Sequence, residues 1–384
     1  NFYVDRSILL FCCVMLYAYY LCIPTNTFVF CFKKVLYTKS TMFLFKRNQN
    51  IKRENFFLRT LPQFYIAAFI AGLQGFLTMY VMSNFLSRFV SEFMVGLFYF
   101  FAALISIFAL FWIPKMLGKI GNLNTILILS NLGLLTYLAF AFGNSLWLIL
   151  PAFLMSQLNA TLLIYTLDVF LEHITPSEEI TGNVRGVMIT IFNTALILSP
   201  FIAGFILGDT ENYRSLFLLS ALLISIFGIF IASSFKQLSE PTYKLLTLKE
   251  ISATFKSYSS LSYTYLAQVI LRLFYAWMVV YTPLYLHTRI GIPWETLGVM
   301  LGIMPLPFLV LTLPVGKIVD KIRGEKELMM IGFFITGVAT ALISFHETSN
   351  LIFWILILLL TRIGAAIIEI TNESFFFKQV NGED

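Results

Sequence analysis

The sequence contains little charge, little histidine, and no cysteine after its first tenth. Charged residues make up 12% of the 384 positions and hydrophobic residues 59%, which is too apolar for a water-soluble protein of this length. All four cysteines lie at or before Cys31 without metal-ligand spacing, so neither a zinc site nor a disulfide framework is expected. The composition therefore predicts a membrane protein.

Sequence signatures of common enzymes are missing as well. There are three histidines, and the pair His346-Glu347 is not followed by the second histidine of a zinc-protease helix. No Gly-Lys-Ser or Gly-Lys-Thr phosphate-binding loop occurs. We therefore expect no catalysis, cofactor or metal, and any transport would be driven by an ion gradient or by the substrate's own gradient.

Ten apolar stretches of membrane-spanning length follow one another along the chain. Each has about 20 residues, which at about 1.5 Å per helical residue matches a hydrocarbon core of roughly 30 Å. The fold class is therefore an all-α polytopic membrane protein. The predicted spans are 62–84, 94–114, 124–142, 146–169, 185–207, 215–234, 262–286, 296–315, 327–345 and 351–371.

Basic residues alternate between successive loops and predict the topology. With the segment before Leu61 in the cytoplasm, at least from Lys33, twenty of the 26 Lys and Arg residues are cytoplasmic. The opposite loops contain only Arg88, Arg214 and Arg289. The positive-inside rule favours this orientation in an inner or plasma membrane. The net charge of +6 belongs to these loops, so nucleic acid is not an expected partner.

The first 60 residues differ from the rest of the chain. Residues 8–32 are apolar enough for an additional span, yet they include Pro24, and the chain does not begin with Met. One interpretation is an extra N-terminal span or uncleaved signal anchor. The other is a non-native leader that precedes a start near Met42.

Two loops of similar sequence suggest an internal repeat. Residues 114–122 follow the second span and residues 316–326 follow the eighth. Gly118 and Asp320 occupy equivalent positions, at the separation expected for a six-helix repeat plus a linker. The expected division is an N-terminal extension (1–60), a six-helix half (61–234), a cytoplasmic linker (235–260) and a second half with four helices (261–384).

The second of these loops resembles the signature loop of the major facilitator superfamily. That signature reads Gly, three residues, Asp, Arg or Lys, one residue, Gly. Gly316, Asp320 and Lys321 match in register, and Gly324 is one position late.

The first loop and the fifth span add weaker matches. Only Lys119 and Gly121 match the signature in the first loop. The fifth span resembles the Gly-Pro-rich helix-packing motif of the family's antiporters at Ser199, Pro200 and Gly204.

The resemblance implies two six-helix halves that rock about a central site, in a monomer that moves a small molecule. Helices eleven and twelve are then expected beyond Asp384, with a true ten-helix protein as the alternative. Asp320 is interpreted as a cytoplasmic latch that holds neighbouring helix ends. The alternative is a solvated carboxylate that balances Lys317 and Lys321.

Charged side chains inside spans are the main site candidates, because a buried charge needs a partner or water. Arg362 lies halfway along the tenth span. Arg272 lies in the seventh, with Tyr265, Gln268 and Tyr275 on its own helix face. In the family, helices one, four, seven and ten line the cavity. Two guanidinium groups there would suit a carboxylate or phosphate of a substrate.

The alternative is that these arginines are neutralised within the protein. Glu369 lies seven residues beyond Arg362, and Asp168 and Glu172 form an i,i+4 pair in the fourth span. Structural or gating salt bridges and substrate-facing arginines both stay open. Further polar candidates, each of which could instead form an interhelical hydrogen bond, are Gln74, Gln157, Asn159, Tyr165 and Asn193.

The expected function is secondary active transport by alternating access, with proton-coupled efflux as one form of it. A proton or a sodium ion is the expected coupling ion. One alternative is a passive uniporter, or an importer of an organic anion. An alternative of another class is a non-transporting membrane scaffold or sensor, which predicts binding without flux.

Overall fold

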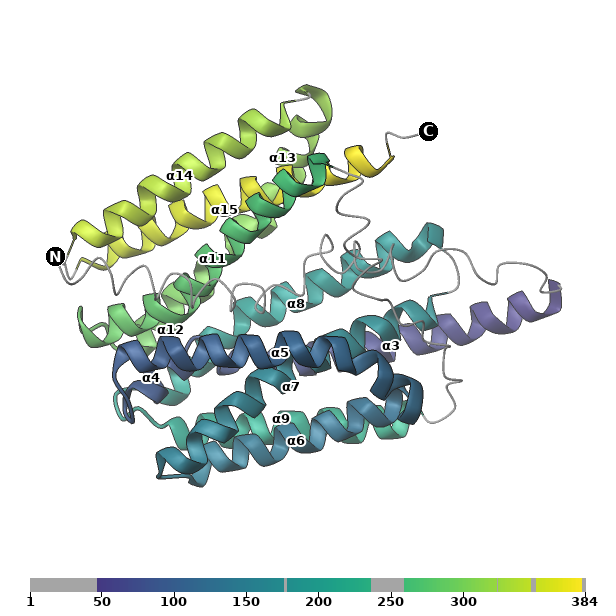
Figure 1. Ribbon diagram of the computed structural model, residues 1–384, viewed down its shortest axis with the longest axis horizontal. Helices are drawn as coiled ribbons and strands as arrows, with labels where there is room; N and C mark the ends of the chain where they lie inside the picture. The colour runs from purple at the N-terminus through teal and green to yellow at the C-terminus, as the bar shows by residue number, and fades with distance from the viewer. Residues whose placement is uncertain (1–46, 176–177, 236–258, 323, 347–349, 382–384) are drawn as a thin grey trace.

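In the part of the chain that the structure describes, all regular secondary structure is α-helical (Figure 1). The computed structural model describes residues 47–175, 178–235, 259–322, 324–346 and 350–381. The four cysteines and most of the predicted linker lie outside these residues. The helices are α3 (Arg47–Leu77), α4 (Met82–Ser87), α5 (Glu92–Ile120), α6 (Asn122–Phe142), α7 (Leu146–Ile174), α8 (Glu178–Leu207), α9 (Tyr213–Ser234), α11 (Ser259–Thr288), α12 (Trp294–Ile303), α13 (Leu306–Ile322), α14 (Glu325–Phe345) and α15 (Leu351–Asn381).

Ten helical segments in the described residues are long and apolar enough to cross a membrane, which confirms the ten predicted spans. A helix suits this environment because it satisfies its own backbone hydrogen bonds where no water is present. The first and eighth spans are each built from two helices, α3 with α4 and α12 with α13. Pro305 stands at the second break and lacks the N–H needed to continue the helix.

The outer surface of the bundle carries large apolar side chains. Trp147, Phe205 and Phe345 are 92%, 83% and 81% exposed. An aqueous surface would not carry so many large apolar groups, whereas lipid tails are as apolar as these side chains. The exposed surface therefore agrees with a lipid environment.

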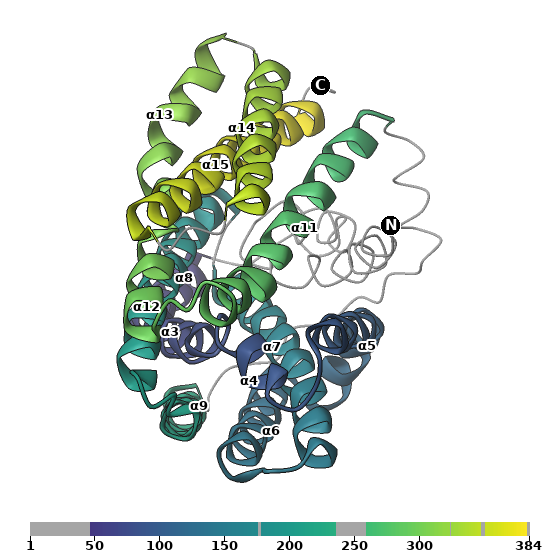
Figure 2. The ribbon, with the colours of Figure 1, turned by 90° about the vertical axis from the view of Figure 1, so that its left-hand side faces the viewer.

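The helices pack as two groups (Figures 1 and 2). In the first group, α3 packs on α8 and α9, α6 packs on α7 and α9, and α5 packs on α7. In the second group, α15 packs on α11, α13 and α14. The main contacts between the groups join α8 to α12 and α4 to α11. Both contacts lie towards the end of the bundle that carries Arg88, Glu211 and His287, which is here named the latch end.

Helices α8 and α12 approach each other backbone to backbone. A Cβ atom on Gly204 would lie 2.6 Å from the Trp294 carbonyl oxygen, and one on Gly298 would lie 2.5 Å from the Pro200 carbonyl oxygen. Both distances are shorter than a van der Waals contact, so no side chain fits at either position. Pro200 and Gly204 of the predicted helix-packing motif therefore lie in the α8–α12 contact, one of the two main contacts between the groups.

The signature loops are only partly described. Gly121 joins α5 to α6 with φ of 82°, a backbone conformation that favours glycine. Lys119 is exposed in the last turn of α5, and Gly324 precedes α14. The side chains of Asp320 and Lys321 lie outside the described residues, so the latch role of Asp320 stays a prediction.

Candidate functional site

A buried ion pair joins α11 to α15. Arg272 Nη2 lies 3.3 Å from Glu369 Oε1, and the two side chains are 8% and 12% exposed. The Tyr275 hydroxyl donates to Glu369 Oε2 at 2.9 Å. Both carboxylate oxygens of Glu369 are therefore bound by groups of α11, as a buried charge requires.

This arrangement corrects the alternative in which Glu369 neutralises Arg362. Seven helical residues separate the two along α15, an axial distance of about 10.5 Å. Only residues three or four positions apart are close neighbours on a helix. Arg272 lies across the helix interface and is the nearer partner, so Glu369 is already engaged.

Three more polar residues extend this group, which we name the α11–α15 cluster. The Gln268 side-chain amide lies between Asn372 and Arg272, 2.9 Å from Asn372 Nδ2, and in the orientation that its neighbours favour its oxygen accepts from Arg272 Nε at 3.0 Å. Glu373 lies within electrostatic range of Arg272. Asn372 and Glu373 were not among the predicted site residues, although they follow Glu369 on the same helix face at +3 and +4.

Arg362 is buried near this cluster but is held differently. It is 4% exposed, and in the described residues no carboxylate lies within ion-pair distance of it. Its guanidinium lies 5.3 Å from the Tyr275 ring centre and 5.5 Å from that of Phe274. Arg272 lies 5.6 Å from the same Tyr275 ring. Tyr80 of the first group is within electrostatic range of Arg362.

Arg362 lies deep within the membrane-spanning part of α15. The spanning part of α15 runs from Leu351 to Phe375. Arg362 therefore lies about 16 Å from one end and about 20 Å from the other, near the middle of the membrane. A guanidinium at this depth, with no carboxylate beside it in the described residues, offers the two parallel N–H donors that suit a carboxylate or a phosphate.

A second buried group of charges lies in the first helix group. Arg185 of α8 is 3.2 Å from Glu172 and 3.8 Å from Asp168 of α7, and it is 6% exposed. Arg185 was predicted to be the first residue of the fifth span, but α8 begins at Glu178, so Arg185 lies about two turns inside the helix. Asp168 and Glu172 therefore both lie within ion-pair distance of Arg185.

The other amide and tyrosine candidates lie on the first helix group. Gln74 is buried beside the Tyr137 side chain, and Asn159 is buried against Gly133, where an added Cβ would lie 2.8 Å from Asn159 Nδ2. These two positions agree with the interhelical alternative. The remaining candidates are partly buried: Gln157 and Tyr165 on α7, and Asn193 on α8.

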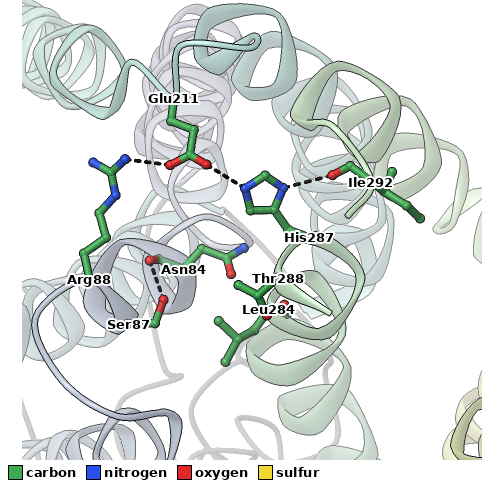
Figure 3. Close-up of polar contacts among 8 residues, drawn as sticks. All are labelled: Asn84, Ser87, Arg88, Glu211, Leu284, His287, Thr288 and Ile292. Atoms are coloured by element: carbon green, nitrogen blue, oxygen red, sulfur yellow. Dashed lines mark hydrogen bonds and ion pairs between the residues drawn. The ribbon is translucent and has the colours of Figure 1, made fainter. Parts of the chain in front are cut away.

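The latch end carries a polar network that joins the two helix groups (Figure 3). Arg88 Nη2 lies 2.6 Å from Glu211 Oε2, and His287 Nε2 lies 2.9 Å from Glu211 Oε1. His287 Nδ1 lies 2.9 Å from the Ile292 carbonyl oxygen. Arg88 also lies 4.4 Å from the Tyr213 ring centre. Glu211 thus connects the end of α4 to the end of α11.

The charge of Glu211 is stabilised by its partners. Partial burial raises its pKa, but hydrogen bonds from His287 and Arg88 outweigh this effect, and the pKa is lowered overall. This network was missed in the sequence, because its members are far apart along the chain. The available signal was that Arg88, Glu211 and His287 all occur at span ends on the predicted non-cytoplasmic side.

Comparisons with known proteins agree with this architecture. The model of the Major Facilitator Superfamily matches residues 6–382. A solved bacterial homologue of the human lysosomal transporter Spinster, inward-facing and unoccupied, is 10% identical, with 83% of this chain and 74% of that chain covered and a TM-score of 0.65. None of the curated proteins compared with the chain matches it.

Two further solved structures have the same fold. The nucleoside transporter NupG is 11% identical, with 84% of this chain and 88% of that chain covered and a TM-score of 0.60. A proton dependent oligopeptide (POT) family transporter is 14% identical, with 84% of this chain and 86% of that chain covered and a TM-score of 0.57.

The expectation of two further helices is not confirmed by these matches. The family model spans nearly all of the sequence, and the chain therefore belongs to the major facilitator superfamily of membrane transporters.

Proposed function

We propose that this protein is a secondary active transporter that moves a small organic anion across the cytoplasmic membrane by alternating access. The observation that carries the proposal is Arg362, a guanidinium buried near mid-membrane without a carboxylate partner in the described residues. A charge at this depth is costly unless it serves a partner or a pathway.

The neighbours of Arg362 favour recognition of a single anionic group. Tyr275 and Phe274 lie against the guanidinium and restrict its position, while Arg272 is already bound by Glu369. One planar arginine offers two parallel N–H donors, which match the two oxygens of a carboxylate or a phosphate. Tyr80 belongs to the first helix group and lies within electrostatic range of the same guanidinium. A ligand bound to Arg362 would therefore contact both helix groups.

The arrangement of the helix groups supports alternating access. The groups meet towards the latch end through α8 with α12 and α4 with α11. We propose that this conformation is open towards the opposite end, the predicted cytoplasmic side. The similar Spinster homologue was solved in an inward-facing conformation.

A transport assay with a controlled gradient tests this function. The full chain is reconstituted in proteoliposomes and exposed to labelled monocarboxylates, dicarboxylates, phosphate esters and a neutral sugar, with and without a pH or sodium gradient. We expect an anion to be taken up and the neutral sugar not. Accumulation against its gradient identifies secondary active transport, whereas equilibration unaffected by either gradient identifies a uniporter. Binding without any flux would favour the scaffold or sensor and contradict the proposal.

A further inference from the structure

His287 is held between two groups that only accept hydrogen bonds. Its Nδ1 faces the backbone carbonyl oxygen of Ile292 and its Nε2 faces a carboxylate oxygen of Glu211, each at 2.9 Å (Figure 3). A carbonyl oxygen cannot donate, and neither can an ionised carboxylate. Neutral histidine has one N–H, so it can satisfy only one of these two contacts.

We name the network of Arg88, Glu211 and His287 the latch; it is distinct from the cytoplasmic latch predicted at Asp320. To satisfy both contacts of His287, the latch must hold one proton more than a neutral imidazole and an ionised carboxylate hold together. Arg88 lies 2.6 Å from the other carboxylate oxygen and favours the ionised form of Glu211. The extra proton then belongs to the imidazole ring, which becomes a cation with two N–H groups. Histidine is the side chain whose charge ordinarily changes between pH 5 and 8.

The surroundings of the latch contain further charged and titratable groups, none with a hydrogen bond or ion pair to His287 in the described residues. They come from each element packed around it: Arg289 beyond α11, Asp209 in the loop after α8, Tyr213 and Arg214 on α9, and Glu295 on α12. Asp209, Arg214, Arg289 and Glu295 are exposed. The Trp294 ring lies against the imidazole ring, with the ring centres 4.7 Å apart and the planes tilted by 39°. The direct partners that decide the proton are thus Glu211, with Arg88 behind it, and Ile292.

The latch joins elements that must separate when this end opens. Arg88 and Glu211 belong to the first helix group and His287 to the second. Separation of the two helix groups would break the contact between His287 Nε2 and the Glu211 carboxylate. His287 would then face only the Ile292 carbonyl oxygen, which a neutral imidazole with one N–H can satisfy. We propose that the Glu211–His287 pair is a proton-binding site, at which closure of the latch end binds one proton and opening releases it.

This inference rests on the alternating-access movement of the proposed function, but not on the identity of the substrate. By linkage, the closed latch holds one proton more than the open one and is therefore favoured as the pH falls. Each pH unit changes the ratio of open to closed protein by up to about tenfold for one bound proton.

Asn84 is a position at which the opening of the latch end can be measured by labelling. It is 3% exposed, lies beside the latch in Figure 3, and its side-chain amide has no hydrogen-bond partner in the described residues. In a background with the four native cysteines replaced by serine, Asn84→Cys is labelled with a membrane-impermeant maleimide in right-side-out and in inverted vesicles. Exposed Ser91→Cys at the same end corrects for the pH dependence of the thiol reaction itself.

The proposal predicts that the labelling rate of Asn84→Cys relative to Ser91→Cys rises about tenfold from pH 6 to pH 8. His287→Gln should abolish this rise. Glu211→Gln should abolish it too, because its amide can donate to the neutral imidazole and the latch no longer needs the extra proton. His346→Gln changes the other histidine at the same end, which is exposed, and should keep the full response.

Three results would overturn the proposal, and they differ in what else they affect. A relative labelling rate that is detectable but independent of pH would remove the proton site and leave alternating access intact. Absence of labelling at every pH, while Ser91→Cys reacts, would show that this end does not open, and both the latch and the proposed transport movement would fail. A pH response that persists in His287→Gln would assign the proton to another group.

Discussion

Arg272 Nη2 lies 3.3 Å from Glu369 Oε1, and this single contact separates the roles of the two arginines inside spans. Arg272 is neutralised across the α11–α15 interface, so its charge serves the packing of two helices. Arg362 has no carboxylate within ion-pair distance in the described residues and lies against aromatic rings. We therefore propose that the structural interpretation applies to Arg272 and the substrate-binding interpretation to Arg362.

The ion pair itself can be tested by coupled substitution. Arg272→Gln or Glu369→Gln alone leaves a buried charge without its partner, which costs about 3 kcal/mol. The double variant removes both charges and should recover most of the loss in apparent Tm of the purified protein. Arg59→Gln, at an exposed position, serves as the control and should not change the Tm. Additive losses in the double variant would mean that the two residues are not coupled.

The contact between α8 and α12 predicts an unequal effect of two glycine substitutions. Gly204→Ala places a methyl group 2.6 Å from a backbone oxygen of α12 and should destabilise the protein by about 1–3 kcal/mol. Gly118→Ala adds the same methyl group inside α5, where no atom lies within 4 Å, and should not destabilise the protein, because alanine favours a helix more than glycine does. Thermal unfolding of the two variants compares them directly. Equal Tm values would show that the two helices do not approach this closely.

The pKa of Glu211 predicts a further effect at acid pH. Its pKa in the folded protein is lower than the ordinary value of 4.5. Its pairing therefore contributes stability that is present above pH 4.5 and is lost as the pH falls through the lowered pKa. The Tm difference between the parent protein and Glu211→Gln should shrink from pH 6 to pH 3. Exposed Glu92→Gln is the control, and a Tm difference for Glu211→Gln that stays constant would contradict the shift.

The helices could be predicted from the sequence because a single span in lipid can satisfy its backbone hydrogen bonds only as a helix. An apolar stretch of about 20 residues must form a helix, whatever its neighbours are. The breaks in the first and eighth spans were not predicted. Pro305 gives a local reason for the second, whereas the turn after Leu77 contains neither proline nor glycine.

The site could be predicted only as far as single helices allow. Arg272 and Arg362 were found because a charge inside a span is rare and costly. The pairing of Arg272 with Glu369 was not predicted, since it crosses a helix interface. The pairing of Arg185 with Asp168 and Glu172 was not predicted either, since Arg185 lies inside a helix that begins earlier than its apolar stretch. The latch network joins residues 88, 211 and 287, which come together only when the two helix groups are placed.

The central claim is that Arg362 binds the anionic group of the substrate, and it is tested by comparing substitutions at that position. Arg362→Lys keeps the charge but loses the planar pair of donors, and Arg362→Gln loses the charge as well. Loss of a charge-assisted hydrogen bond costs about 1.5–3 kcal/mol, which corresponds to roughly 10- to 150-fold in affinity. Arg59→Lys is the matched control at an exposed position.

The decisive measurement is the binding affinity of the purified variants for the anion that the transport assay identifies. The account predicts weaker binding in Arg362→Lys, little or none in Arg362→Gln, and unchanged binding in Arg59→Lys. Binding by Arg362→Gln with the affinity of the parent protein would contradict it.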